Sequence, residues 1–217
     1  MVKNRNCDEE PRRVEQRKKK IKFPYKNVKR HFDENLSDIE EKFALADREK
    51  SNGDLKSAQE IWRSQVVFLD SALDFYIHEV AKLGIIRIFN GDWEETIKYK
   101  TMKVSMDFAL KLAESDENAD ALLGEIDEIN QKNCFMNFEN IQKIMQIVGL
   151  SVNKSKGKGI NELYKRRNQI AHQSDRVPNN PKKQDISEQT VRYYIKIVKS
   201  LVDHIDSKVK AKDLSEN

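Results

Sequence analysis

Residues 55–83 read LKSAQEIWRSQVVFLDSALDFYIHEVAKL, and this stretch decides the fold class. Its apolar residues recur at steps of three and four, which is the spacing of one face of an α-helix. The face is wide enough to contact neighbours on several sides, so the pattern predicts a helix at the centre of a bundle. The predicted buried face comprises Ile61, Gln65, Phe68, Leu69, Ala72, Leu73, Tyr76, Ile77 and Val80.

Helical patterns continue on both sides of this stretch. The sequence has no alternating strand with a hairpin turn and no repeat of fixed period. The central helix is expected to end near Gly84, and residues 151–159 are predicted to form a flexible basic loop. The sequence therefore predicts an all-α bundle of about six or seven helices. Besides the central one, they are expected over Asn27–Lys50, Trp93–Ala113, Leu122–Asn130, Phe138–Val148, Ile160–Gln173 and Ser187–Lys210.

The composition excludes several classes of protein. The 217 residues suit one domain with a sizeable core, and seven glycines and four prolines argue against a β-sandwich or a Rossmann domain with glycine-rich loops. No apolar run approaches the roughly 18 residues of a membrane span, and the first ten residues lack the apolar centre of a signal peptide. Cys7 and Cys134 lie far apart without CxxC spacing, which argues against a zinc finger and indicates a reducing, cytoplasmic location.

Positive charge is concentrated at the N-terminus. Residues 1–30 hold 12 Lys/Arg against 4 Asp/Glu, whereas the net charge of the whole chain is only +4. Such a segment can bind a polyanion through phosphate contacts and counterion release, and a solvated tail explains it equally well. The predicted organisation is a flexible basic arm over residues 1–26, a single helical domain over 27–210 and a C-terminal tail over 211–217.

Only one string of residues suggests chemistry. The chain contains no phosphate-binding GxxxxGK[ST] loop, no GxSxG nucleophile motif and no HExxH metal motif. His78, on the central helix, is interpreted as a partly buried structural histidine. The string over residues 162–176, ELYKRRNQIAHQSDR, places Arg167 five residues before His172 and a polar residue, Asn168, directly after the arginine. A surface helix decorated with basic residues is the structural alternative.

This string resembles the motif of the HEPN superfamily, all-helical domains associated with nucleotides and RNA, and especially of its RiboL-PSP-HEPN branch. The superfamily pattern is R-x4–6-H with a polar residue after the arginine, and Arg167 to His172 fits it. The segment Trp62–Gly84 is similar to the early central helix of that branch, and the resemblance spans roughly residues 30–205. Many antitoxin-linked HEPN toxins carry a tyrosine two residues past the motif histidine, whereas this chain has Ser174. Regulation through that tyrosine is therefore not expected here.

The residue types suit cleavage of a phosphodiester. Arginine offers a planar, permanently charged fork for phosphate oxygens, and histidine can accept or return a proton near neutral pH. Arg167 and His172 are the candidate catalytic residues, and Asn168 is expected to position the substrate or the motif. Asp70 and Asp74 share a helix face that could approach and orient the motif, or could simply be solvated. Candidate RNA-binding residues are Arg166, Lys165, Lys156 and Lys158.

The resemblance implies that two copies pair with their motifs facing one cleft. The leading hypothesis is a metal-independent endoribonuclease that acts as a homodimer, in a toxin or anti-phage defence setting with an antitoxin or other partner protein. No cofactor and no metal are expected, because no Asp, Glu, His or Cys cluster has ligand spacing and RNA supplies its own 2′-hydroxyl nucleophile. The competing hypotheses are a non-catalytic HEPN module that binds RNA, nucleotide or a protein, and a plain interaction bundle.

Overall fold

The computed structural model describes residues 20–114, 118–132, 137–176 and 181–215. Apart from one isolated bridge between Arg176 and Lys183, regular structure in these ranges is helical, so the predicted all-α fold is confirmed. Residues 1–19 of the predicted arm, both cysteines and the segment 177–180 lie outside the described residues. The helices are α1 (Tyr25–Ser51), α2 (Leu55–Phe89), α3 (Ile97–Lys100), α4 (Met106–Glu114), α5 (Asn118–Lys132), α6 (Phe138–Ile147), α7 (Gly157–Gln173) and α8 (Glu188–Ser215), with a 3-10 turn η1 (Lys154–Lys156).

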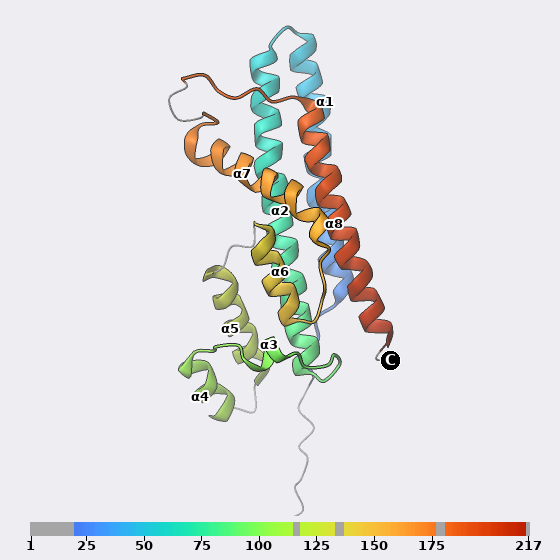
Figure 1. The fold of residues 1–217 in the computed structure, drawn as a ribbon, viewed down its shortest axis with the longest axis vertical. Helices are drawn as coiled ribbons and strands as arrows, with labels where there is room; N and C mark the ends of the chain where they lie inside the picture. Colours follow the sequence, from blue (N-terminus) through green and yellow to red (C-terminus); the bar gives the residue numbers. More distant parts are fainter. Residues whose placement is uncertain (1–19, 115–117, 133–136, 177–180, 216–217) are drawn as a thin grey trace, which may run out of the picture.

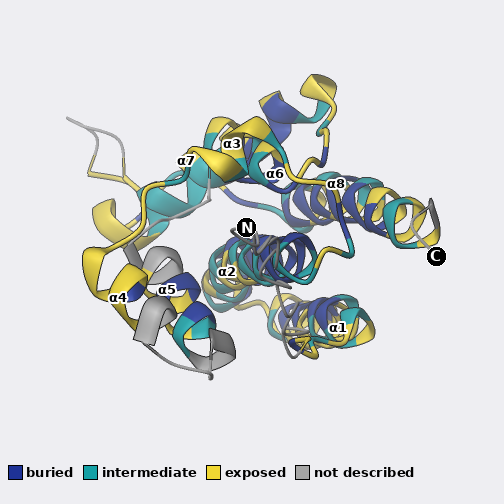
Figure 2. Cartoon of the chain, turned by 90° about the horizontal axis from the view of Figure 1, so that it is seen from below, coloured by how far each residue is buried: buried dark blue, intermediate teal, exposed yellow. Residues whose placement is uncertain are grey.

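The predicted central helix lies at the centre of the bundle. Helix α2 contacts α1, α6, α7 and α8, and viewed from below it lies between α1, α8 and the α6–α7 layer (Figures 1 and 2). Its buried side chains include Trp62, Val66, Leu69, Leu73, Tyr76, Ile77 and Val80. Asp54 starts the helix by accepting the Ser57 backbone N–H at 2.9 Å, which satisfies one of the unpaired donors of the first turn.

The expectation that Phe68 is buried is wrong. Its side chain is 49% exposed and lies beside a groove between α1 and α2, with the Lys42 ammonium 5.5 Å from the ring centroid. The apolar face of α2 is wider than the surface that α1 covers, so a residue at its edge remains in contact with water. Phe75, two turns further along, is exposed for the same reason.

Three glycines expected at breaks are instead sites of close helix packing. Helix α2 continues past Gly84, where an added Cβ would lie 2.5 Å from the Cβ of Val148. Helix α7 begins at Gly157, inside the predicted flexible loop, and a Cβ there would lie 2.7 Å from the Phe138 ring. At Gly159 a Cβ would overlap Ile197 of α8. The missing side chains let α7 approach α6 and α8 closely. Residues 154–159 of the predicted loop are therefore η1 and the start of α7, and only residues 151–153 are non-helical.

The single helix expected over Trp93–Ala113 is also wrong. The chain forms the short helix α3, a non-helical stretch and then α4. Thr96 caps α3 by accepting the Tyr99 N–H at 2.9 Å, and Ser105 caps α4 by accepting the Phe108 N–H at 3.1 Å. Glu125 of α5 in turn accepts the Ser105 N–H at 2.8 Å. Capping side chains and this tertiary bond therefore interrupt a segment whose apolar spacing alone suggests one helix.

The described end of the N-terminal arm lies against the body of the domain. Lys20 forms an ion pair with Asp92 at 2.5 Å, and Asn90 hydrogen-bonds both the N–H and the C=O of Ile21. Figure 1 shows this end of the bundle opposite the C-terminal end of α7. With about 1.5 Å per residue along α2, the 20 residues from Asp70 to Asn90 correspond to roughly 30 Å. The arm therefore enters the domain far from the motif helix.

Among the described residues, no helix combines the length and the apolarity that crossing a bilayer requires. Helix α8 begins one residue after the predicted start at Ser187 and extends five residues beyond the predicted end at Lys210. Helix α1 likewise begins at Tyr25, two residues before the predicted domain start. The proposed division into arm, domain and tail stays a prediction.

Candidate functional site

The motif residues occupy the second half of α7, which crosses α2 (Figure 1). The helix ends abruptly because Ser174 and Asp175 both adopt left-handed backbone conformations, with φ of 50° and 60°. The Asp175 N–H then reaches back to the C=O of Gln169 at 2.8 Å and satisfies one carbonyl of the last turn. The end of the motif helix is therefore fixed one residue after Gln173.

Arg167 contacts the central helix. Its Nε lies 3.3 Å from Oδ2 of Asp70, and its Nη1 donates to Oδ1 of Asn168 at 3.0 Å. Asp70 is only 1% exposed, whereas the Arg167 side chain keeps 22% exposure. The guanidinium is thus held from the protein side and remains reachable from solvent. The structure brings together three predicted site residues: Arg167, Asn168 and Asp70.

Burial raises the pKa of Asp70 from 3.8 to about 7. Loss of hydration is the largest cause, since the carboxylate lies in a low-dielectric environment. The Arg167 charge opposes the rise, and the negative charge of Asp74 adds to it. The protonation state of Asp70 therefore changes near neutral pH, next to the guanidinium that is expected to bind phosphate.

Asp74 and His78 form a second pair one turn further along α2. Oδ2 of Asp74 lies 3.5 Å from Nε2 of His78, and both side chains are partly exposed. The two predicted acidic residues therefore have different partners: Asp70 faces Arg167 and Asp74 faces His78. His78 is partly buried, as the sequence suggested.

His172 points elsewhere. Five residues correspond to about 140° around an α-helix, so Arg167 and His172 occupy different faces of α7. The imidazole is exposed and makes no hydrogen bond to another residue that the structure describes. Within one chain, the two candidate catalytic residues therefore do not converge on a shared cleft.

A buried charge cluster, not anticipated from the sequence, anchors the chain just after His172. Asp175 is 1% exposed, and its Oδ2 accepts from Nε of Arg63 at 2.6 Å and from Nη2 of Arg166 at 3.0 Å. Both arginines also donate to backbone carbonyls of the returning loop: Arg63 to Gln184 at 2.8 Å and Arg166 to Asp185 at 2.9 Å. Arg63 lies 112 residues before Asp175, so no local pattern could have revealed the pair.

Two of the predicted RNA-binding residues, Arg166 and Lys156, are hydrogen-bonded within the protein, and the other two, Lys158 and Lys165, are exposed. The guanidinium of Arg166 is occupied by Asp175 and the loop carbonyls, and its RNA-binding role stays a prediction. Lys158 and Lys165 are exposed on α7, and Lys158 lies 4.0 Å from Glu162. Lys156 is partly buried and donates to the hydroxyl of Ser200 on α8. Within the described ranges, no group of three His, Cys, Asp or Glu side chains is arranged to hold a metal ion.

The burial of Asp70 beside Arg167 leads to a testable prediction about stability. Asp70→Asn is expected to raise the free energy of unfolding above pH 7 relative to wild type, and to have little effect near pH 4. The folded protein keeps a proton on Asp70 that the unfolded chain releases, so this group stabilises the fold below about pH 4 and loses that contribution as the pH rises to 7. A shift of three pKa units sets an upper limit of about 4 kcal/mol.

Urea unfolding of both proteins from pH 5 to 8 measures this effect. The difference between them should widen up to pH 7 and then level off. Asp107→Asn, on the exposed surface of α4, is the control and should show no such trend. A difference that does not change with pH would contradict burial of an ionisable Asp70.

The family of this chain is identified by comparison with known proteins. Searches of curated proteins and of solved structures found no match to this chain. The model of the RiboL-PSP-HEPN family matches residues 33–211, which includes α2, the motif helix α7 and nearly all of α8. The match covers well over half of the chain, and the helical fold agrees with it. This chain therefore belongs to the RiboL-PSP-HEPN family.

Proposed function

We propose that this protein is a metal-independent endoribonuclease that cleaves RNA in a cleft formed by two copies of the chain. The observation that carries the proposal is the placement of Arg167, whose charge is anchored by buried Asp70 while its side chain stays accessible to solvent. A guanidinium held in this way is suited to a phosphate group. Family membership supports RNA as the substrate class or ligand.

The chemistry requires two proton transfers. His172 takes the proton of the 2′-hydroxyl as that oxygen bonds to phosphorus, and the bond from phosphorus to the 5′ oxygen breaks. A second, protonated imidazole gives its proton to the leaving 5′ oxygen. Arg167 stabilises the extra negative charge on the phosphate in the transition state. The products are a 2′,3′-cyclic phosphate and a 5′-hydroxyl.

The position of His172 supports the two-copy arrangement. In a single chain the imidazole faces solvent, away from Arg167, and one imidazole cannot act as base and acid in the same step. A two-fold axis near the end of α7 brings a second His172 and a second Arg167 to the same cleft. The toxin or defence setting and a partner protein stay predictions.

The alternative is a HEPN module that binds RNA without cleaving it. A specific observation favours it: no described side chain orients the imidazole of His172, whereas a catalytic base is usually held by a third group. Cleavage assays separate the two functions, since both predict RNA binding and only the first predicts products.

Cleavage is expected to persist in excess EDTA. The Arg–His chemistry uses the 2′-hydroxyl of the substrate and has no step that needs a divalent ion. A fluorescent RNA oligonucleotide, incubated with the purified protein and EDTA, should give fragments with cyclic phosphate ends. The same oligonucleotide with a single 2′-deoxy sugar at the cleaved position should remain intact.

The His172→Ala protein, purified identically, controls for contaminating ribonucleases. Fragments that appear only after divalent metal is added, or equal cleavage by the His172→Ala preparation, would contradict the proposed mechanism.

A further inference from the structure

A shallow groove of about 410 Å³ lies between the start of α7 and the middle of α8. We call it the α7–α8 groove. It is strongly basic, because three lysines line it and none of its lining residues is acidic; the residues relevant here are Lys156, Lys158, Tyr193, Lys196 and Ser200. Such a concentration of positive charge fits a polyanion.

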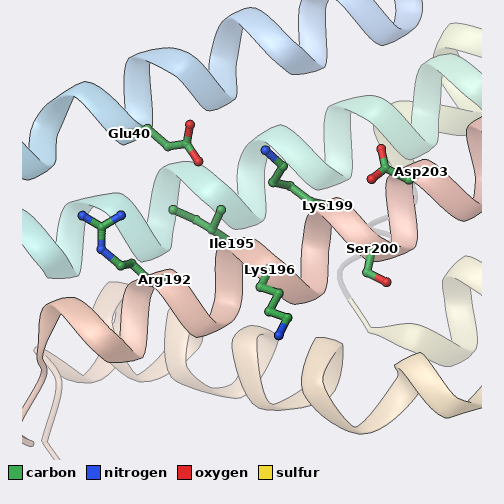
Figure 3. Close-up of a pocket in the computed structure, with 7 residues that line it drawn as sticks. All are labelled: Glu40, Arg192, Ile195, Lys196, Lys199, Ser200 and Asp203. Atoms are coloured by element: carbon green, nitrogen blue, oxygen red, sulfur yellow. The ribbon is translucent and has the colours of Figure 1, made fainter.

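The neighbouring groove on the other side of α8 differs in charge. It has a volume of about 480 Å³ and contains Lys199 and Arg192, but Glu40 and Asp203 also line it. In Figure 3, Lys199 lies on the side of α1 and α2, whereas Lys196 extends toward α7. Lys196 lines both grooves, but the α7–α8 groove is the more positive: three lysines and no acid line it, whereas three cations face two acids in its neighbour. The acid next to the α7–α8 groove is Glu162, which contacts Lys158 and Tyr193.

An exposed aromatic ring completes the α7–α8 groove. Tyr193 is 47% exposed and lines the groove beside the lysines, and its hydroxyl donates to Oε2 of Glu162 at 3.3 Å. Lysines that follow a backbone, together with an aromatic face on which a base can stack, are the combination that proteins use for single-stranded nucleic acids.

The groove is aligned with the motif. Lys158, Lys165 and His172 follow one another at seven-residue steps, each of which turns by only about 20° around α7, so the first and last differ by about 40°. All three are exposed. With about 1.5 Å per residue, the line from Lys158 to His172 measures roughly 21 Å. The phosphates of a stacked strand are about 3.4 Å apart, so this length corresponds to about six nucleotides.

We propose that the α7–α8 groove binds the flanking part of a single-stranded RNA, whose backbone follows Lys165 along α7 to the cleavage site at His172. Lys156, Lys158 and Lys196 contact phosphates, and one base stacks on Tyr193. This inference rests on the proposed function, in which RNA is the substrate. It adds that the RNA is single-stranded, and it gives the length of RNA that the protein contacts on one side of the cleaved bond.

Binding is tested with the full-length His172→Ala protein, so that RNA is not consumed. Fluorescence anisotropy with a 12-nucleotide single strand is measured at several KCl concentrations. Adding Lys158→Gln or Lys196→Gln should each reduce the slope of log affinity against log salt by about 0.7, because each removes one phosphate contact to a single strand. Lys111→Gln on α4, an exposed lysine outside the groove, should leave the slope unchanged.

The aromatic contact has its own test. Tyr193→Ala should weaken binding roughly 5- to 150-fold with little change in the salt slope, the range expected for loss of one stacked base. Tyr193→Phe keeps the ring and should bind like the parent protein. Four results would overturn the proposal. The salt slope could respond equally to Lys111→Gln, or the affinity could stay unchanged for Tyr193→Ala. The protein could also bind a 12-base-pair duplex with equal affinity, or bind no RNA at all.

Cleavage distinguishes this inference from the proposed function. In the protein with His172 intact, Lys196→Gln should raise KM for substrates with six or more nucleotides on the bound side, and leave KM unchanged for shorter ones. If the protein binds RNA with the expected salt slopes but never cleaves it, the endoribonuclease proposal is wrong and the proposal for the α7–α8 groove is supported. If Lys196→Gln changes KM for no substrate length while cleavage persists, the groove assignment fails alone.

Discussion

Replacement of His172 by alanine is expected to lower the rate of RNA cleavage by roughly 100- to 10,000-fold, the usual loss when general acid–base catalysis is removed. RNA affinity should persist, because the imidazole is an exposed side chain whose removal leaves Arg167 and the lysines in place. Single-turnover cleavage and anisotropy measure the two quantities separately. Wild-type rates in the His172→Ala protein would refute the site assignment.

Arg167→Ala should affect both RNA binding and cleavage, unlike His172→Ala. It removes the charge that meets the phosphate, so both cleavage and RNA affinity should decrease. The fold should be retained because Arg167 is only partly buried and its partner Asp70 can be protonated near neutral pH. The substitution also leaves Asp70 buried without its cation, which should raise the pKa of that carboxyl further. The Arg167→Ala/Asp70→Asn double variant removes this second effect and isolates the contribution of Arg167 to RNA binding.

Mixed dimers test whether one cleft uses both chains. A heterodimer of one wild-type and one His172→Ala chain should lose most of its activity if each cleavage needs both imidazoles. Two tags of different charge allow its purification. Half of the wild-type activity in the heterodimer would instead indicate that each chain works alone.

Asp175→Ala is expected to reduce the free energy of unfolding by about 3–5 kcal/mol, since removing one partner of a buried ion cluster leaves the other charges uncompensated. Two arginines, Arg63 and Arg166, lose their shared carboxylate, and Arg63 is almost fully buried. Urea unfolding at pH 7 measures the loss. Asp107→Ala removes a comparable but exposed ion pair with Lys111 and should change stability by less than about 1 kcal/mol.

Asp175→Asn separates charge from backbone geometry. Asparagine tolerates the left-handed conformation at this position, so only the ion pairs are lost. Amide hydrogen exchange over residues 169–173 should become faster in this variant, because the anchor directly follows the last turn of α7. Unfolding and exchange indistinguishable from the Asp107→Ala control would show that the cluster does not hold the motif helix in place.

Much of the fold could be predicted from the sequence because helix periodicity is a local property. Helix α1 lies where the pattern over Asn27–Lys50 predicts it, and its buried residues recur at helical spacing: Phe32, Leu36, Ile39 and Phe43. The helix predicted to begin at Ser187 is α8, and the Ser187 hydroxyl accepts the N–H of Thr190 in its first turn. Local spacing was misleading where a tertiary contact or a cap decided the outcome. Glu125 accepts from Ser105 and helps separate α3 from α4, and Val148 packs on Gly84, where a helix end was expected.

The sequence by itself determined the helical class and the central position of α2, because these depend on residue type and spacing along one helix. The candidate pair Arg167 and His172 came from the resemblance of its R-x4-H string to the HEPN motif. Only the tertiary structure decided which acid faces Arg167, and that Arg166 and Arg63 share Asp175. The contacts of Arg167 with Asp70 and of Arg63 with Asp175 join residues about 100 positions apart. Their strength comes from burial, which raises the pKa of Asp70 and makes an unpaired charge costly. Burial depends on how whole helices pack, and no short stretch of sequence contains that information.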